Sequence, residues 1–262
     1  MGDSRSVSQK KEYEKCPWGY YLHRIEKVTE RGAAWLPMGL GVHEAAEEWE
    51  KSGRTMSVQD AQAVFRESYA THTNRLAEVM DWDYWFPSGP YRGYDDVSRR
   101  SVIGQDQVTK YIDYYTQKAP HEVIWITPEG EPAIELGFNI DLDGVPVRGF
   151  IDQVISFDEN SEPIVRDIKT GNKPGDDFQL AVYALAVNEL YGSDIKVGDY
   201  WMGRQGKPTK ESYKLDFWTK EKITEEFHKV DEGIRSGDFP ANPSEDNCKF
   251  CSVASACQFA VR

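Results

Sequence analysis

Apolar residues recur every three or four positions over much of the first 120 residues, which is the spacing of helices that bury one face. This pattern predicts four helical stretches, over residues 9–21, 38–51, 57–86 and 99–118. Ser6 and Ser8 are candidate N-caps for the first helix, and Pro17 predicts a local break inside it. The third stretch ends in an aromatic-rich segment, DWDYWFPSGPY, which we expect to be a loop because it contains two prolines and a glycine.

In the second half of the chain the period changes to two, and short segments rich in β-branched residues alternate with turn signals. Strands are predicted over residues 121–127, 133–144, 145–157, 163–171, 197–204 and 212–218. Hairpin turns are expected at LDGV (142–145) and at FDENSEP (157–163). Two more helices are predicted, over 177–191 and over 219–236, the latter with Thr219 as N-cap. This order of elements predicts an α/β fold with a central mixed β-sheet flanked by helices.

The composition supports a folded chain with a buried core. Of the 262 residues, 39% are hydrophobic and 29% are charged, a balance that argues against general disorder. At 30.0 kDa we expect one large domain, or one domain with a small appendage. Mean hydropathy is −0.64 and no apolar run approaches the roughly 20 residues that cross a bilayer, so no membrane span is expected. The first residues are polar, which argues against a secretory leader and favours the cytoplasm.

The net charge bears on the class of partner. The chain has 31 Lys and Arg against 44 Asp and Glu, which gives a net charge of −13. A protein that binds nucleic acid non-specifically usually has the opposite balance. An acidic chain can still bind nucleic acid through a local basic groove or through metal ions, and clustered carboxylates suit a bound cation.

Three of the four cysteines lie near the C-terminus with the spacing C-x2-C-x5-C, at Cys248, Cys251 and Cys257. Structural disulfides are rare in a reducing cytoplasm, so this clustering favours metal ligation. The fourth ligand would be Cys16, and a four-thiolate site would therefore join the two ends of the chain. Both a [4Fe–4S] cluster and Zn²⁺ fit four thiolates, and the presence of a single C-x2-C pair favours iron–sulfur modestly. The alternative is a set of free thiols on a flexible tail.

Two predicted strands carry acids next to apolar residues. Asp167 and Lys169 are two positions apart on one strand, so their side chains share a face. If Asp152 on the preceding strand lies opposite, one small surface carries two carboxylates and an ammonium, a set that suits Mg²⁺. The lysine would then be placed to position or deprotonate a water molecule. The alternative is an ordinary ion pair on a solvated sheet face.

Two predicted helices add polar candidates. His43 is a potential metal ligand, although a lone histidine is more often structural, and Glu44 and Glu47 are alternative acids on the same helix. Gln179 and Tyr183 are four residues apart and so share a helical face. They can donate hydrogen bonds to a phosphate or to a metal-bound water, or can simply mark the polar edge of an amphipathic helix.

Taken together, these segments resemble the RecB-like exonucleases of the PD-(D/E)XK superfamily. The motifs stand in the family's order: GxxxH ending at His43, GxxD ending at Asp152, DxK from Asp167 followed by Thr-Gly, and QxxxY from Gln179. The N-terminal Tyr13-Glu-Lys-Cys-Pro and the three C-terminal cysteines are most similar to the iron–sulfur branch. That branch includes CRISPR-associated exonucleases, phage-encoded relatives and the AddB nuclease domain. The resemblance runs from about residue 8 to about residue 258, with no assignable motif over 52–120.

The resemblance implies a role for each matching residue. His43, Asp152 and Asp167 would bind Mg²⁺ or Mn²⁺ together with the Ile168 carbonyl, and Lys169 would be the catalytic lysine. Gln179 and Tyr183 would orient DNA or the lysine. A [4Fe–4S] cluster would be held by Cys16, Cys248, Cys251 and Cys257. It also implies a restriction-endonuclease-like core over 38–238 with a helical insertion at about 52–120, an N-terminal segment over 1–37 and a cysteine-rich tail over 239–262.

The expected function is a metal-dependent DNA exonuclease that acts on single strands or DNA ends in a bacterial or phage-infected cell, with recombination, replication or CRISPR-type proteins as possible partners. Candidate phosphate contacts are Arg92, Arg99, Arg100, Lys169, Lys173, Arg204 and Lys207. Candidate base-stacking residues, which the sequence equally allows to be packing residues, are Trp82, Trp85 and Trp201. The alternative function is a cluster-stabilised, non-catalytic DNA-binding or adaptor subunit in recombination or repair.

Overall fold

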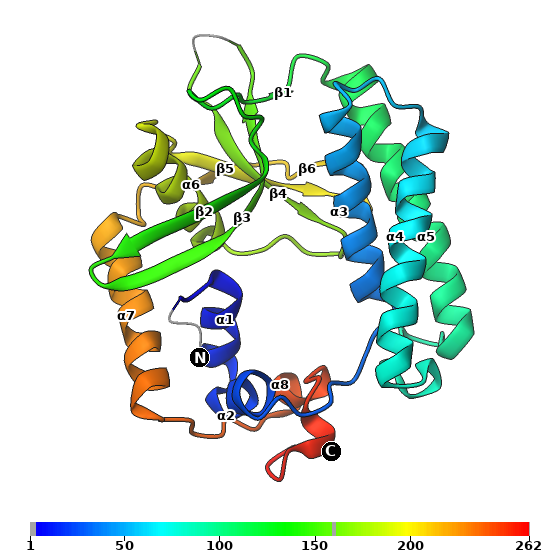
Figure 1. Cartoon of the computed structure of the whole chain (residues 1–262), viewed down its shortest axis with the longest axis vertical. Helices are drawn as coiled ribbons and strands as arrows, with labels where there is room; N and C mark the ends of the chain where they lie inside the picture. Colours follow the sequence, from blue (N-terminus) through cyan, green and yellow to red (C-terminus); the bar gives the residue numbers. More distant parts are fainter. Residues whose placement is uncertain (1–3, 159–160, 262) are drawn as a thin grey trace.

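The computed structural model describes residues 4–158 and 161–261, and its centre is a mixed β-sheet of seven strands (Figure 1). The strand order is β1-β3-β4-β5-β6, with β2 paired to β3 and β7 paired to β5. Among the strand pairs of the described residues, β4 and β5 are parallel and the others are antiparallel. The strands are β1 (Val123–Ile124), β2 (Ile134–Leu142), β3 (Val145–Ser156), β4 (Ile164–Lys169), β5 (Val197–Met202), β6 (Lys207–Pro208) and β7 (Tyr213–Lys214). The predicted α/β fold with helices flanking a mixed sheet is confirmed.

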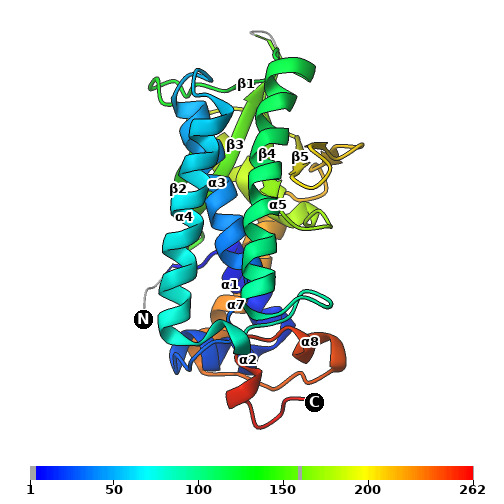
Figure 2. The same ribbon diagram turned by 90° about the vertical axis from the view of Figure 1, so that its right-hand side faces the viewer.

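Three long helices form a layer on one side of the sheet: α3 (Trp35–Lys51), α4 (Val58–Val79) and α5 (Gly93–Asp113). Figure 2 shows them running alongside one another. Their shared core includes Trp49 and Phe65 and reaches Trp201 of β5, all fully buried. The helices approach closely at Gly104, where a Cβ atom would lie 2.1 Å from the Phe65 ring. A larger side chain at position 104 would push α5 away from α4 and disrupt the packing of this helical layer.

The other side of the sheet is covered by α6 (Asp177–Tyr191) and α7 (Lys220–Ser236). Apolar residues of α6 and α7 join those of β2, β3, β4 and β5 in the largest hydrophobic core. The helix α6 begins at the Asp176 N-cap and ends before Gly192, whose φ of +70° is the left-handed conformation that glycine adopts easily. This packing fixes α6 against β4, the strand that carries the DxK motif.

The two ends of the chain meet away from the sheet (Figure 1). The N-terminal elements are α1 (Val7–Lys15), α2 (Pro17–Tyr20) and the π-helical turn η1 (Tyr21–Ile25), and the C-terminal ones are α8 (Glu245–Lys249) and the 3₁₀ turn η4 (Ala254–Ala256). The Asn242 side chain donates a hydrogen bond to the Lys15 carbonyl at 3.0 Å, and Trp18 packs edge-to-face on Phe259. The chain before α1 returns to the sheet, where Arg5 forms a parallel bridge with Val147 of β3.

Several element predictions are confirmed and others need correction. The break at Pro17, the Thr219 N-cap, the hairpin turn at Asp143 and Gly144, and the extent of α6 are as expected. Ser6, not Ser8, caps α1, because the Ser6 hydroxyl accepts the hydrogen bond from the Gln9 N–H.

The extent of other elements differs from the sequence prediction. α3 and α5 begin earlier than predicted, the first predicted strand is only two residues long, and β6 was not predicted. The 3₁₀ turn η2 (Trp82–Tyr84) and the π-helical turn η3 (Tyr114–Lys118) complete the helices. Residues 159–160 of the second predicted turn lie outside the described residues. No helix in the described ranges is long and apolar enough to cross a membrane.

Candidate active site

The register between β3 and β4 brings the two motif aspartates side by side. Gln153 pairs with Arg166, so Asp152 lies opposite Asp167 at the end of the ladder. The Asp152 carboxylate accepts a hydrogen bond from the Ile168 N–H at 2.7 Å. Lys169 lies on the same side of β4 as Asp167, with 2.7 Å between the Lys169 Nζ and Asp167 Oδ2 atoms. The cross-strand arrangement expected from the sequence is therefore present.

The helix α3 carries His43, whose side chain lies beside Asp152 and Ile168. Its Nε2 atom lies 3.0 Å from the Ile168 carbonyl oxygen, and its Nδ1 atom lies 3.5 Å from Asp152 Oδ2. Close packing of α3 on the end of β4 allows this reach, since a Cβ atom on Gly39 would stand 3.4 Å from the Thr170 hydroxyl. Of the two alternative acids of this helix, Glu47 pairs with Lys51 at 2.5 Å and Glu44 is exposed.

The sequence reasoning missed a third acidic residue of the site, Glu135 of β2. Its carboxylate lies 3.5 Å from His43 Nδ1. Ligand atoms of Glu135, His43 and Asp152 all lie within 4.8 Å of one another. Glu135 has a φ of +43°, the left-handed region that non-glycine residues rarely adopt and that is often associated with functional sites. The sequence signal was an acid inside the apolar run Ala-Ile-Glu-Leu, on the strand that pairs with the Asp152 strand.

The crowding of carboxylates changes the protonation of this site. Burial raises the pKa of Asp152 to about 7, and the neighbouring charge of Asp167 adds to the effect. Burial lowers the pKa of His43, but the carboxylates of Asp152, Glu135 and Asp167 outweigh it and raise that pKa to about 9. Asp167 is 2% exposed, and its Oδ2 atom is paired with the Lys169 ammonium. A buried cluster of this kind requires a positive charge, and His43 and Lys169 supply only part of it.

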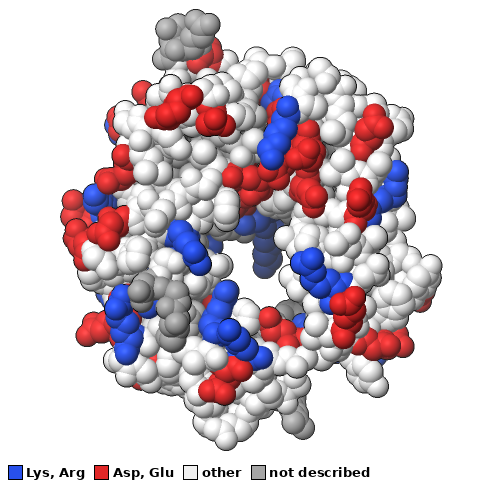
Figure 3. Space-filling view, viewed as in Figure 1, with Lys and Arg blue, Asp and Glu red and all other residues white. Residues whose placement is uncertain are grey.

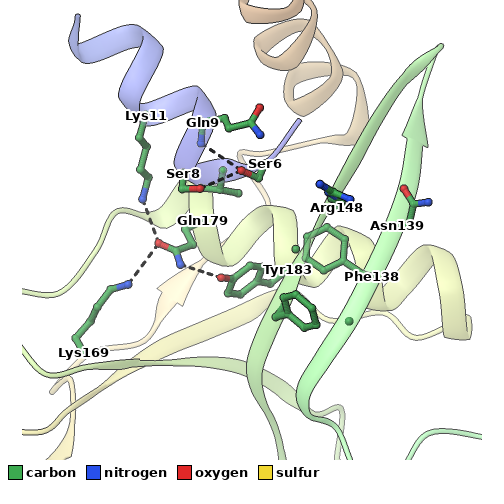
Figure 4. A pocket seen from close by; sticks show the side chains of 14 residues that line it. Ser6, Ser8, Gln9, Lys11, Phe138, Asn139, Arg148, Lys169, Gln179 and Tyr183 are labelled. Atoms are coloured by element: carbon green, nitrogen blue, oxygen red, sulfur yellow. Dashed lines mark hydrogen bonds between the residues drawn. The ribbon is translucent and has the colours of Figure 1, made fainter. Parts of the chain in front are cut away.

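Gln179 of α6 links Asp167 to Lys169, and Figure 4 shows its contacts with Lys169, Lys11 and Tyr183. Its amide nitrogen donates to Asp167 Oδ1 at 2.6 Å and to the Tyr183 hydroxyl at 2.9 Å. Its amide oxygen accepts hydrogen bonds from Lys169 at 3.5 Å and from Lys11 of α1 at 3.1 Å. The QxxxY pair therefore holds Asp167 and Lys169 in position from the helix side.

A comparison with protein families identifies the chain. The family profile described as the PD-(D/E)XK nuclease superfamily matches residues 4–258, nearly the whole length. The chain belongs to the PD-(D/E)XK nuclease superfamily. Membership implies a hydrolase that cleaves nucleic acid with the help of a divalent metal such as Mg²⁺ or Mn²⁺.

Curated relatives of this nuclease come from mycobacteriophages. A protein named Gene 69 protein, from Mycobacterium phage D29, is 49% identical, with 97% of this chain and 96% of that protein covered. The Gene 69 protein of Mycobacterium phage L5 is 47% identical, with 97% and 95% covered. Among solved structures, the crystal structure of SSO0001 covers 97% of this chain and 95% of its own at 13% identity, with a TM-score of 0.35, too low to support further comparison.

The four cysteines of the nuclease converge although 232 residues separate Cys16 from Cys248. All four line one small cavity where the N-terminal and C-terminal segments meet. Asn242 donates its backbone N–H to the Cys16 sulfur at 3.4 Å. Burial raises the pKa of the Cys251 thiol, and the nearby Cys16 and Cys248 sulfurs raise it further. No disulfide joins these cysteines.

The residues predicted to contact DNA lie on different parts of the nuclease surface, and some of them are buried. Arg99, Arg100 and Arg204 line one open cleft of about 540 Å³, together with Trp35 and Phe250. Lys207 instead borders a different cleft beside Arg166, and Arg92 and Lys173 are exposed. The stacking prediction is wrong for Trp85 and Trp201, which are 5% and 0% exposed because they pack inside the helical layer. Trp82 is itself partly buried and packs against the same core.

Proposed function

We propose that this protein is a metal-dependent DNA exonuclease that acts on single strands or DNA ends. The observation that carries the proposal is the convergence of His43, Glu135, Asp152 and Asp167 around the Ile168 peptide, with Lys169 beside Asp167. The mycobacteriophage relatives support action inside an infected bacterial cell.

The donor set fits a divalent cation. The carboxylates of Glu135 and Asp152 and the imidazole of His43 lie within one group, and hard cations such as Mg²⁺ and Mn²⁺ bind oxygen ligands of this kind. The Asp167 carboxylate, which is paired with Lys169, and the Ile168 carbonyl would be further ligands. When bound, the metal lowers the pKa of a water molecule and stabilises the negative charge that develops on the phosphate.

The protein's own residues then have distinct tasks. The Lys169 ammonium is held between Asp167 and Gln179, so it can orient the attacking water or donate to the phosphate without leaving its place. Gln179 fixes the Asp167 carboxylate through its amide nitrogen, and Tyr183 fixes Gln179 in turn. This chain of hydrogen bonds keeps the site ordered before the substrate arrives.

Four thiols around one cavity support a structural [4Fe–4S] cluster held by Cys16, Cys248, Cys251 and Cys257. A single Zn²⁺ would bring its sulfur ligands to within about 3.8 Å of one another, from Zn–S bonds of about 2.3 Å. Among the residues described, only His43, Glu135 and Asp152 form a group of three or more metal-binding side chains within 4.8 Å. The wider spacing of the sulfurs favours the larger cluster over Zn²⁺, which remains the alternative.

The test is release of nucleotides from labelled single-stranded DNA with Mg²⁺ or Mn²⁺, and with a chelator. We expect cleavage by the wild-type protein and a loss of at least 1,000-fold, on the order of a lost transition-state contact, in Lys169→Ala. Lys196→Ala is the matched control, because Lys196 is an exposed lysine that forms an ion pair with the exposed Asp194. Full activity of Lys169→Ala would overturn the assignment, and DNA binding without cleavage by the wild type would indicate the non-catalytic adaptor.

Iron and zinc analysis of protein purified without oxygen tests the cluster separately. We expect iron, a brown colour and broad absorption near ~400 nm, all lost in Cys251→Ser. If the wild-type protein contained zinc and no iron, the four cysteines would instead hold a structural zinc ion.

A further inference from the structure

One buried polar residue of the helical layer has no part in the site described above. Charged side chains are spread over the molecular surface, as Figure 3 shows for one face. Gln107 of α5, in contrast, is 0% exposed and belongs to the buried side of that helix, together with Gly104, Val108 and Tyr111. An apolar side chain of the same size would pack at this position without burying a polar group, so the glutamine requires a specific explanation.

The Gln107 amide reaches the segment that follows Lys169. Its nitrogen donates a hydrogen bond to the Thr170 carbonyl at 3.1 Å. Its oxygen accepts no hydrogen bond from the residues that the structure describes. Because a buried acceptor without a partner lowers stability, the stability of the helical layer does not explain this residue. The hydrogen bond to Thr170 is what the glutamine adds.

The same amide is wedged against Gly203, the residue after β5. A Cβ atom on Gly203 would lie 2.1 Å from the Gln107 amide oxygen, so Gln107 leaves room only for glycine at this position. Gly203 does not have the positive φ that would by itself require a glycine. The Gly203 N–H in turn donates to the Lys169 carbonyl at 2.8 Å. Gln107 therefore contacts the residue that follows Lys169 and the residue that binds its carbonyl.

The position of Lys169 in the sheet makes these contacts important. Lys169 is the last residue of β4 that pairs with β5. The next peptide lies outside the ladder, and the end of a strand frays unless other groups hold it. The Gly203 N–H holds the Lys169 carbonyl, and Gln107 holds the carbonyl of Thr170. Together they fix the backbone from which the Lys169 side chain extends.

The Lys169 ammonium depends on this backbone for its place. Its Nζ atom lies 2.7 Å from Asp167 Oδ2 and 3.5 Å from the Gln179 amide oxygen. A displacement of about 1 Å in a catalytic group can lower a rate about 100-fold. The helix α6 holds the tip of the lysine through Gln179, and α5 holds its backbone through Gln107.

We propose that Gln107 is a positioning residue, which orients the Lys169 ammonium at the metal site by holding the Thr170 carbonyl beside Gly203. This inference rests on the proposed nuclease function and adds a residue to its machinery. Gln107 belongs to the helical insertion over residues 52–120, which has no motif of the family. The insertion then serves the reaction as well as covering the sheet.

The variant Gln107→Met keeps the size of the side chain and removes the hydrogen bond to Thr170. We expect kcat on labelled single-stranded DNA with Mn²⁺ to fall about 10- to 100-fold, with the KM and the Mn²⁺ affinity within about 2-fold of wild type. Gln105→Met is the matched control and should keep the wild-type kcat, because the Gln105 amide bonds Ser101 and Arg66 instead.

The outcomes separate the two levels of the account. A kcat of Gln107→Met within about 2-fold of an active wild type would overturn the positioning role and leave the nuclease function intact. A parallel loss of kcat and Mn²⁺ affinity would also overturn it, since Gln107 would then shape the whole site. No cleavage by the wild type would instead refute the nuclease function.

Hydrogen exchange provides a measurement that does not depend on cleavage. We expect the amides of residues 169–172 to exchange at least about 5-fold faster in Gln107→Met than in the wild type, and at the wild-type rate in Gln105→Met. Unchanged exchange in Gln107→Met would show that Gln107 does not hold this segment.

Gly203→Ala tests the same contact from the other side. The added methyl group should displace the Gln107 amide and lower kcat as Gln107→Met does. In Gln107→Ala/Gly203→Ala the methyl group has room, so the double variant should be no slower than Gln107→Ala alone. A double variant whose loss equals the product of the two single losses would contradict the contact and overturn the proposal.

Discussion

The Asp152 carboxylate accepts a hydrogen bond of 2.7 Å from the backbone N–H of Ile168. The carbonyl of the same residue lies 3.0 Å from His43, so Ile168 is held from both β3 and α3. Asp167 and Lys169 flank Ile168 in the sequence, and fixing this residue therefore fixes the direction of both functional side chains. The geometry of the DxK motif thus depends on two residues outside it.

Metal binding should release protons, and its affinity should rise with pH. In the metal-free protein the pKa of Asp152 is raised to about 7 and that of His43 to about 9, so both groups hold protons at neutral pH that a cation must displace. As the pH rises through these values the competing protons are lost. Calorimetry with Mn²⁺ in buffers of different ionisation enthalpy measures the number released. A pH-independent affinity between pH 6 and 9 would contradict the shared site.

Replacing Glu135 with glutamine should weaken Mn²⁺ binding by about 10- to 100-fold, because the group loses one carboxylate while its size is kept. The affinity is measured by calorimetry, independently of cleavage. Glu129→Gln, at an exposed position before β2, is the matched control and should bind Mn²⁺ as the wild type does. If Glu135→Gln bound Mn²⁺ with wild-type affinity, Glu135 would not be a metal ligand.

Arg166→Met should destabilise the fold by about 3–5 kcal/mol. The guanidinium is 1% exposed and binds Asp199 through Nε at 2.6 Å and Glu122 through Nη1 at 2.5 Å. Removing it leaves the buried carboxylates of Asp199 and Glu122 without their counter-charge, on the sheet face opposite to Asp167. Urea unfolding measures the loss, with the exposed Arg92→Met as control. A change below about 1 kcal/mol would show that the carboxylates find other partners.

The stability contributed by His23 should disappear at high pH. Hydrogen bonds with Glu12 and then Glu30 raise the pKa of His23 to about 9, against the effect of burial. A raised folded-state pKa adds stability that is complete below the unfolded-state value of about 6.5 and is lost as the pH rises through about 9. Because the side chain is partly exposed, we expect about 1 kcal/mol after solvent screening. Unfolding of wild type and His23→Gln should differ at pH 6 and converge at pH 10; a constant difference would contradict this linkage.

The sequence predicted the parts of the site that local periodicity determines. The period of two along a strand places Asp167 and Lys169 on one face, and the GFID segment next to it supplies Asp152. His43 is 125 residues from Ile168, and only the resemblance to a known family connected them, because the packing of α3 on the sheet is a tertiary property. Glu135 was missed for a related reason: its direction depends on a left-handed φ that no propensity predicts.

Tertiary packing also explains why the sequence did not predict which aromatic residues are buried. Trp201 belongs to the central strand β5, and the layer of α3, α4 and α5 covers it completely, which the sequence around it does not reveal. Phe150 stands in an apolar run that suggests a core residue, yet it is 65% exposed and lines the cleft between α1, the β2–β3 hairpin and α6. Whether a single strand residue is buried or exposed therefore depends on which elements pack against it, and the hydrophobic pattern of the strand alone does not determine it.

The most direct measurement of the central claim is anomalous diffraction from crystals grown or soaked with Mn²⁺. We predict a peak bounded by His43, Glu135, Asp152 and Asp167, and its loss in Asp167→Ala. A crystal of cleavage-competent protein with manganese bound elsewhere and no peak among these four side chains would contradict the account.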